Sequence, residues 1–243
     1  MSLLAQKLLC FDVYGTLIDW ESGIYTAAAP LLSQLSSAPT RDAFLRTYVA
    51  HESAQQALTP QLRYSELLAL VYTQLATHYG LSAPTPAAAN AFGASIGTWP
   101  AFADSADALA ELKKSFKLVV LSNVDGLSFS ESVKQLGGAG VFDLVLTAEI
   151  IGSYKPDPAN FEYMLREVAE RFGVARDQVL VTAQSRLHDH VPAKKLGLKG
   201  AWIDRAGASI GSDEIPGATY EWRFSTMGEM AAAVAKERAA GAL

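Results

Sequence analysis

The chain has 243 residues, of which half are apolar, and its formal net charge is −5. This length suits one large domain or two smaller ones, the acidic balance argues against nucleic acid as a partner, and the single Cys10 excludes an internal disulfide framework. No stretch approaches the ~20 apolar residues of a membrane span and the N-terminus lacks a signal-peptide pattern, so we expect a cytoplasmic protein with no membrane partner.

The first predicted element is a strand that ends at an acidic residue. An apolar run at residues 8–11 leads into Asp12 and then into a turn of small residues, a pattern that predicts a fully buried strand. In open parallel sheets, functional groups lie just beyond the carboxyl ends of the strands. Asp12 is therefore either a nucleophile restrained by a rigid strand or an aspartate that caps a turn.

The next segment contains only helical patterning, up to about residue 100. Helices are predicted near residues 22–35, 40–58, 64–79 and 86–96. A wholly helical insert between the first and second strands of a parallel sheet indicates a cap over the site. We assign residues 20–98 to this helical cap and residues 1–19 and 99–243 to a Rossmann-like catalytic core.

Three further apolar runs each deliver polar groups at their carboxyl ends. These are Ser122 and Asn123 after residues 116–121, Lys155 after residues 142–146, and Gln184 and Asp189 after residues 178–181. Helical patterns fill the intervals, including a C-terminal helix near residues 226–240, and the glycine-rich stretch 137–140 is typical of a helix-ending turn. The predicted fold is α/β: a doubly wound, mostly parallel sheet with an inserted all-helical cap.

These motifs, Asp-x-Tyr-Gly-Thr-Leu at residues 12–17 followed by Ser-Asn, Lys-Pro and a final Asp, resemble the haloacid dehalogenase superfamily over essentially the whole chain. The resemblance implies that Asp12 is the nucleophile and Asp189 the second acidic residue. It also implies that Thr16 and Ser122 hydrogen-bond the nucleophile or an anionic substrate group, and that Lys155 keeps the acidic cluster ionised. Electrostatics agree, because two carboxylates in one site raise each other's pKa and a nearby ammonium reverses the effect.

The residue two positions after the nucleophile separates the possible reactions. Phosphatases of the superfamily usually have a second Asp there and Gly-Asp-Ser before the last acidic residue, where this chain has Tyr14 and Ala-Gln-Ser at 183–185. Tyr14 resembles the 2-haloacid dehalogenase branch, in which Asp attacks C2 of a small carboxylate, halide leaves and water cleaves the resulting ester. That chemistry requires no metal and no acid for the leaving group, so no cofactor is expected.

The match to that branch is incomplete. Phe161 stands where those enzymes typically have a Tyr, and Gln-Ser-Arg at 184–186 replaces Ser-Ser-Asn. Arg41 and Arg46 fall roughly where the cap of those enzymes presents an Arg to the departing halide, although solvated surface positions are the default for arginine.

Three alternatives stay open. The same branch includes azetidine-2-carboxylate hydrolase, which opens a strained ring by the same displacement and would need a group such as Tyr14 to hold the leaving ammonium. The cap residues that could assist there, or simply pack within the helices, are Trp20, His51, Glu52 and Tyr64. A magnesium-dependent phosphatase would use Asp12, Asp189 and the Tyr14 carbonyl around Mg²⁺. A non-catalytic binder of small acids is the third alternative.

The expected partner is a small-molecule carboxylate, and the sequence leaves a homodimer open. The predicted substrate-binding residues are Tyr14, Asn123, Trp20 and Gln184. No resident metal is predicted. The sequence His-Asp-His at 188–190 is not interpreted as a zinc site, because adjacent and alternate residues at a helix start do not face one another and no Cys/His set completes a tetrahedron.

Overall fold

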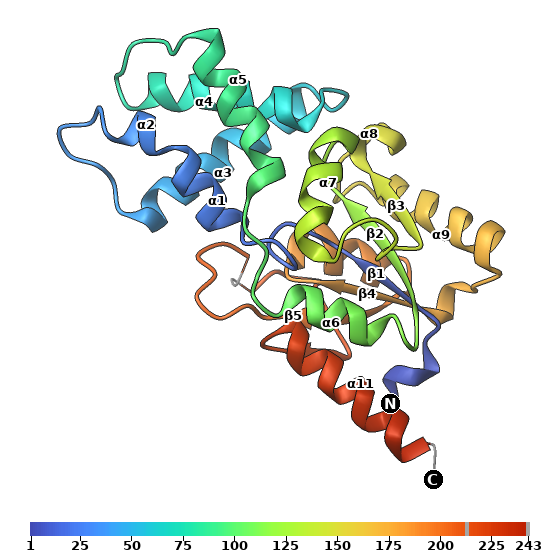
Figure 1. The fold of residues 1–243 in the computed structure, drawn as a ribbon. Coiled ribbons are helices and arrows are strands. Elements are labelled where there is room, and N and C mark those ends of the chain that lie inside the picture. The colour runs from blue at the N-terminus through green and yellow to red at the C-terminus, as the bar shows by residue number, and fades with distance from the viewer. Residues whose placement is uncertain (212–213, 242–243) are drawn as a thin grey trace.

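In the computed structural model, which describes residues 1–211 and 214–241, six strands form one parallel sheet in the order β3-β2-β1-β4-β5-β6 (Figure 1). The strands are β1 (Leu8–Phe11), β2 (Lys117–Ser122), β3 (Leu144–Thr147), β4 (Val179–Ala183), β5 (Lys199–Ile203) and β6 (Trp222–Phe224). The chain builds outward from β1 first on one side and then on the other, which creates a topological switch point between β1 and β4. The predicted doubly wound α/β sheet is confirmed.

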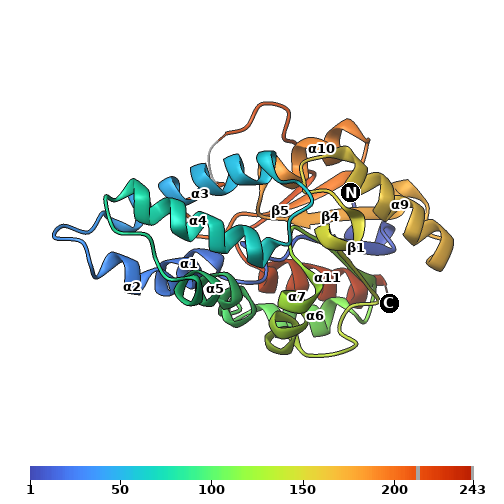
Figure 2. The ribbon, with the colours of Figure 1, turned by 90° about the horizontal axis from the view of Figure 1, so that it is seen from above.

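Helices cover both faces of this sheet. They are α6 (Ser105–Leu112), α9 (Pro158–Phe172), α10 (Val191–Lys195) and α11 (Met227–Gly241). Helices α9 and α10 lie on one side, and α6 and α11 on the other (Figure 2). Along β1, Leu8 and Cys10 pack in the cluster beneath α9, whereas Leu9 and Phe11 pack with the residues of α6 and α11. Both faces are therefore buried, which explains the continuous apolar runs in the sequence.

Residues 20–98, which come between β1 and α6, contain helices and no strand, and this helical segment lies beside the sheet (blue to green in Figure 1). Its elements are α1 (Trp20–Ala27), α2 (Ala29–Leu32), α3 (Arg41–Leu58), α4 (Tyr64–His78), α5 (Pro86–Ala94) and the 3₁₀ turn η2 (Ser95–Thr98). The single helix predicted over residues 22–35 is wrong, because the chain breaks near Ala28 and restarts with Pro30 in the first turn of α2. Proline lacks the N–H that a continuous helix needs.

The last two strands are not apparent in the sequence pattern. Strand β6 has three residues, none of them fully buried, and it forms the edge of the sheet. An edge strand this short carries almost no hydrophobic periodicity. The remaining short elements are η1 (Leu3–Ala5), α7 (Gly126–Ser132), η3 (Val133–Leu136), α8 (Ala148–Ile151), η4 (Arg176–Gln178) and η5 (Arg186–His190). Gly137 ends η3 with a φ of 110°, so the expected helix-ending turn is confirmed.

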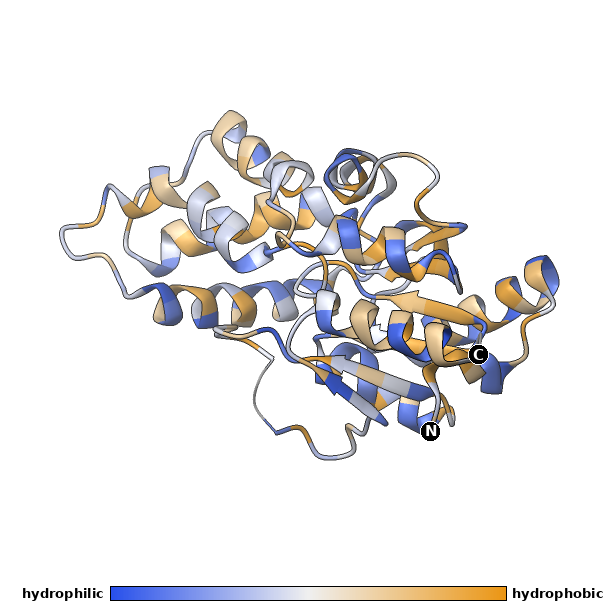
Figure 3. Cartoon of the chain, turned by 60° about the horizontal axis from the view of Figure 1, so that its bottom comes forward, coloured by the Kyte–Doolittle hydropathy of each residue, from blue (hydrophilic) through white to orange (hydrophobic). Residues whose placement is uncertain are grey.

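The helices alternate between hydrophilic and hydrophobic residues along their length (Figure 3). Such alternation is typical of helices that bury one face against a core and leave the other in water. Among the residues that the structure describes, no helix has both the length and the apolar character needed to cross a bilayer.

The packing of α9 on the sheet is expected to contribute strongly to stability. Phe161, Met164 and Val168 form its fully buried stripe. We expect Phe161→Ala to lower the free energy of unfolding by about 3–5 kcal/mol, because the lost ring leaves a cavity that the sheet cannot fill. The neighbouring Glu162→Ala changes an exposed side chain and should stay within about 0.5 kcal/mol. Urea titrations of both variants measure the difference, and equal midpoints would contradict this packing.

Candidate active site

Asp12 follows β1 directly and is 8% exposed. Its Oδ1 accepts from Lys155 Nζ at 2.9 Å, and its Oδ2 accepts from the Thr16 hydroxyl at 2.8 Å. Thr16 Oγ1 in turn accepts the backbone N–H of Gln184 at 2.9 Å. Thr16 therefore ties the end of β1 to the end of β4 and fixes the orientation of the Asp12 carboxylate from behind.

The loop after Asp12 is a tight turn. Gly15 has a φ of 100° and donates its N–H to the Ile18 carbonyl at 2.8 Å, a backbone shape that favours glycine. Ile18 also bridges to Ala101. Arg205 donates from Nε and Nη2 to the Thr16 carbonyl at 3.1 and 2.7 Å. These contacts fix the loop, so the Asp12 carboxylate is held in position at the edge of the site.

Lys155 joins the two acidic residues. Its ammonium donates to Asp12 Oδ1 at 2.9 Å, to Asp189 Oδ1 at 2.7 Å and to the Leu121 carbonyl at 2.8 Å, so all three of its protons are used. Burial alone would lower the pKa of this ammonium, but the two carboxylates outweigh burial and hold the pKa above its ordinary value. Burial raises the pKa of Asp189, and Lys155 opposes that rise. The cluster is a strongly coupled unit.

Asn123 fixes the backbone of Lys155. Its Oδ1 accepts the Lys155 N–H at 2.7 Å, and its Nδ2 donates to the Lys155 carbonyl at 3.0 Å. Both polar atoms of the Asn123 side-chain amide are therefore bound by the backbone of Lys155, which comes after β3 in the chain. Asn123 lines the site as predicted, but these contacts make it a positioning residue for the ammonium.

Asp189 is delivered by η5, a π-helical turn over Arg186–His190. Ser185 caps this turn by accepting the His188 N–H at 3.1 Å, and its hydroxyl also lies 3.1 Å from His188 Nδ1. His190 is buried and donates from Nε2 to a backbone carbonyl of β4. The wider π turn places Asp189 and His188 on the same wall, as such turns often do at functional sites.

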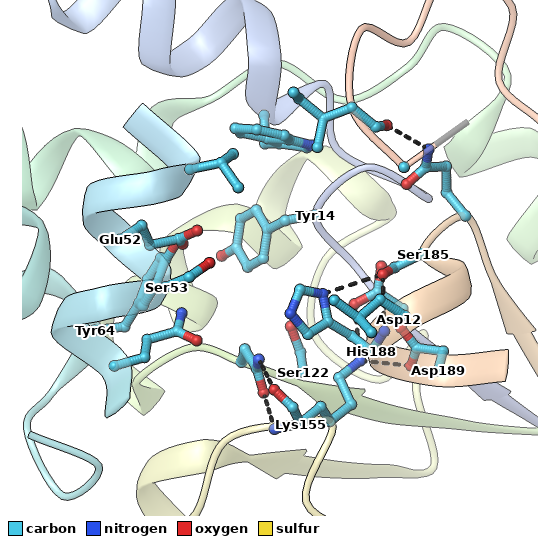
Figure 4. A pocket seen from close by; sticks show the side chains of 18 of the residues that line it. Asp12, Tyr14, Glu52, Ser53, Tyr64, Ser122, Lys155, Ser185, His188 and Asp189 are labelled. Atoms are coloured by element: carbon cyan, nitrogen blue, oxygen red, sulfur yellow. Dashed lines mark hydrogen bonds and ion pairs between the residues drawn. The ribbon is translucent and has the colours of Figure 1, made fainter. Parts of the chain in front are cut away.

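These groups open onto a cavity of about 280 Å³ that is lined by the sheet core and by the helical segment (Figure 4). The sequence-predicted residues on its wall are Asp12, Tyr14, Trp20, Ser122, Asn123, Lys155, Gln184 and Asp189. Thr16 stands behind Asp12 and is fully buried. Of the cap residues named from the sequence, Glu52 and Tyr64 also lie on the wall. The other residues on the wall are Val49, Ser53, Gln56, Trp99, Ser185, Leu187, His188, Ile210, Gly211 and Ile215.

Two buried oxygens on this wall have no hydrogen-bond partner within the described chain. They are Ser122 Oγ and Asp189 Oδ2. An unpaired buried polar atom costs free energy, and in a cavity it marks a place where a ligand or water binds. Ser122 can donate to an anionic group, whereas Asp189 can accept a proton.

Two of the predicted substrate-binding side chains are partly engaged by the protein. The Tyr14 hydroxyl lies 2.9 Å from Ser132 Oγ, and its ring packs edge-on against Trp99. Burial raises the pKa of Tyr14, so the phenol is neutral. Gln184 Nε2 donates to the Ile210 carbonyl at 2.9 Å, which ties the loop after β5 to the cavity wall. Tyr14 thus presents its ring to the cavity more than its hydroxyl.

The structure places the two arginines away from this cavity. Arg41 pairs with Glu21 at 3.2 Å and lines a smaller neighbouring pocket. Arg46 pairs with an acidic side chain one turn earlier on α3. His51 packs against the ring of His78 instead of the cavity. Neither arginine lies on the cavity wall, because Arg41 faces Glu21 and Arg46 donates to the Ser209 carbonyl of the loop after β5.

Sequence reasoning missed most of the wall contributed by loops. The sequence singles out His188 only as part of His-Asp-His at 188–190, although the Ser185–His188 spacing is typical of a capped turn. Ile210, Gly211 and Ile215 lie in the loop after β5, and no local pattern distinguishes them. Within residues 1–211 and 214–241, no group of three His, Cys, Asp or Glu side chains is arranged to hold a metal ion.

Comparison with known proteins adds independent information. Residues 6–182 match the model of the haloacid dehalogenase-like hydrolases. The chain is 30% identical over 230 residues to an (S)-2-haloacid dehalogenase of Pseudomonas sp. (strain YL), covering 91% of both. It is 27% identical to a phosphoglycolate phosphatase of Neisseria gonorrhoeae, covering 79% of this chain and 77% of that one. The L-2-haloacid dehalogenase of Xanthobacter autotrophicus with chloropropionic acid covalently bound superposes with a TM-score of 0.75 at 18% identity, covering 95% and 98%.

The buried ammonium predicts a pH-dependent loss of stability in Lys155→Met. We expect a cost of about 3–5 kcal/mol, because two buried carboxylates lose their shared cation. Without it the pKa of Asp189 rises further above its ordinary 3.8. A carboxyl group whose pKa is higher in the folded than in the unfolded state stabilises the fold at pH values below its unfolded pKa. This contribution is lost as the pH rises through the folded pKa. The deficit relative to wild type should therefore grow as the pH rises above about 7, where Asp189 ionises in the wild-type protein but keeps its proton in the variant.

Urea unfolding at several pH values measures this deficit. Lys134→Met is the matched control, because it removes an exposed ammonium that pairs with Glu131 and should change stability by less than about 0.5 kcal/mol. A deficit in Lys155→Met that is flat with pH would contradict the coupling.

Proposed function

Because this chain belongs to the haloacid dehalogenase-like hydrolases, we propose that Asp12 displaces the substituent at C2 of a small carboxylate and forms an ester, which water then cleaves. One observation carries the proposal. The Asp12 carboxylate is held by Lys155 and Thr16 at the wall of the cavity, while neutral Tyr14 occupies the position of a phosphatase's acid. Displacement at carbon by a carboxylate needs such restraint and exposure.

The first step forms a bond between an Asp12 oxygen and C2, and the bond from C2 to the leaving group breaks. Lys155 supports the ionised carboxylate cluster through its contacts at 2.9 and 2.7 Å. Ser122, whose hydroxyl has no partner in the described chain, is placed to donate to the substrate's carboxylate. The small volume of the cavity favours small acids.

The second step hydrolyses the ester at its carbonyl carbon. Asp189 Oδ2 is free of hydrogen bonds within the described residues, so it is the group that accepts a proton from the attacking water. Lys155 lies within hydrogen-bond distance of both carboxyl groups and stabilises negative charge on the tetrahedral intermediate. Cleavage returns the Asp12 carboxylate and releases a 2-hydroxy acid.

The helical segment is the proposed cap of this site. It contributes Trp20, Glu52 and Tyr64 to the cavity wall, so substrate must contact it once bound. Exclusion of water by such a segment strengthens the electrostatic interactions within the site. The substrate used to test this proposal is a 2-haloacid, whose leaving group is a halide, because the Pseudomonas relative is named an (S)-2-haloacid dehalogenase.

A single turnover in H₂¹⁸O tests the covalent step. We expect the first product molecule to carry unlabelled oxygen from Asp12, and Asp12 itself to gain the label. The experiment uses 2-chloropropionate with and without EDTA, followed by mass spectrometry of the peptide that contains Asp12. Asp12→Asn should lower turnover by more than about 10³-fold. EDTA-sensitive release of phosphate from a phosphate ester, with no label on Asp12, would support the phosphatase alternative instead.

A second prediction concerns Asp189→Asn. Because an amide cannot accept the proton of water, this variant should form the ester and hydrolyse it slowly. Intact-protein mass spectrometry is expected to show one added substrate unit minus its leaving group. Asp177→Asn is the control, since Asp177 is exposed and should show no adduct. Normal turnover by Asp189→Asn would assign the base to another residue.

A further inference from the structure

His188 is a residue of the cavity wall that the proposed mechanism leaves unused. It lies on η5 directly before Asp189, and its ring projects into the cavity (Figure 4). Asp12 and Lys155 are close enough to act on the ring electrostatically. Burial is the main cause that lowers the pKa of His188 to about 4, so the ring is neutral at pH 7. A neutral imidazole carries one ring proton, and the position of that proton decides what the ring can bind.

Ser185 determines which ring nitrogen carries that proton. The Ser185 hydroxyl oxygen accepts the backbone N–H of His188 at 3.1 Å, and it also lies 3.1 Å from Nδ1 of the same residue. Among the residues that the structure describes, Nδ1 is the one acceptor within reach of the hydroxyl proton. If Ser185 donates to Nδ1, both groups are satisfied and the ring proton lies on Nε2. The other tautomer would leave the hydroxyl proton without an acceptor.

The other donors near the strand ends are largely taken up by the protein itself. Lys155 uses all three protons of its ammonium. The side-chain nitrogens of Asn123 and Gln184 already donate to backbone carbonyls. The Ser122 hydroxyl and His188 Nε2 have no hydrogen bond within the described part of the chain. These two are therefore the donors that the strand ends keep for a ligand.

The substrate carboxylate has to bind close to Asp12. In the proposed ester, C2 is bonded to an Asp12 oxygen and also carries the carboxylate, so C2 alone separates the two groups. Asp12 and Asp189 already occupy the ammonium of Lys155. A buried anion without donors is costly, and a hydrogen bond to a charged group is stronger than one between neutral groups. A free donor beside Asp12 is therefore best matched by the substrate carboxylate.

Given the displacement at C2 proposed above, on which this inference rests, we propose that His188 binds the substrate carboxylate through its Nε2–H, while Ser122 donates to the other carboxylate oxygen. Ser185 is then a positioning residue, because it fixes the tautomer of the ring. No arginine is among the described residues of the wall, so two neutral donors hold the anion. Being uncharged, they do not compete with Lys155 for Asp12.

Equilibrium binding of propionate, a carboxylate with no leaving group, tests this contact by calorimetry. His188→Phe keeps an aromatic ring and removes the donor, so the dissociation constant of propionate should rise roughly 10- to 100-fold. KM for 2-chloropropionate should rise by a similar factor while kcat changes little, because the contact is present in the ground state and in the transition state. His188→Gln offers a side-chain N–H at a similar reach and should recover part of the loss.

His78→Phe is the matched control. His78 is an exposed histidine at the end of α4 and does not line the cavity, so this variant should bind propionate as the wild type does. Thermal unfolding of each variant shows that a change in binding is not a loss of folded protein. The ¹⁵N NMR signals of the His188 ring test the tautomer separately, and we expect the proton on Nε2.

Three results would overturn this role of His188. Unchanged propionate binding in folded His188→Phe would make it a packing residue, and a ring proton found on Nδ1 would remove the donor. An unchanged KM with a lower kcat and accumulated ester would place the ring on the hydrolytic water instead. The displacement mechanism fails separately: wild-type protein that binds propionate through His188 but gains no ¹⁸O label on Asp12 would reject that mechanism and keep the carboxylate contact.

Discussion

The ammonium of Lys155 is the interaction on which the rest of the site depends. Two buried carboxylates that lie close together cannot both ionise unless a cation lies between them. Lys155 supplies that cation, with its Nζ 2.9 Å from Asp12 Oδ1 and 2.7 Å from Asp189 Oδ1. Asn123 fixes its backbone, and the Leu121 carbonyl takes its third proton. A long flexible side chain thus becomes a rigid part of the sheet edge.

The order of the strands explains why this cation can reach both acids. Strand β1 lies between β2 and β4, so the residues that follow these three strands, among them Asp12, Ser122 and Asp189, meet at one point. The helices on both faces keep the strand ends from moving apart, while Thr16 and Arg205 fix the loop after β1. We therefore expect stability and the proposed catalysis to depend on the same contacts, and a substitution at Lys155 to affect both.

The predictable part of the site is the part that is local in sequence. Asp12, Ser122, Lys155 and Asp189 each follow an apolar run, and parallel strands bring such positions together whatever the details of packing. The break near Pro30 and the edge strand β6 depend on single residues or on very short segments. The positions of Arg41 and Glu52 depend on the rotation of α3 against the core, because about three helix turns separate Arg41, which pairs with Glu21, from Glu52, which faces the cavity. Helical periodicity identifies a buried face but not what lies opposite it.

The division between core and helical segment suggests how one mechanism serves different leaving groups. In the proposed mechanism the strand ends supply the nucleophile, the cation and the base, and none of their contacts depends on what departs from C2. The wall opposite the strand ends is formed by α3 and α4, which contribute Glu52 and Tyr64. A halide needs donors or a cation there, since it leaves as an anion, whereas a nitrogen needs an acceptor for its proton. This chain places the carboxyl group of Glu52 at that wall and no arginine among the wall's described residues, so we expect the helical segment, more than the edge of the sheet, to determine which leaving group is accepted.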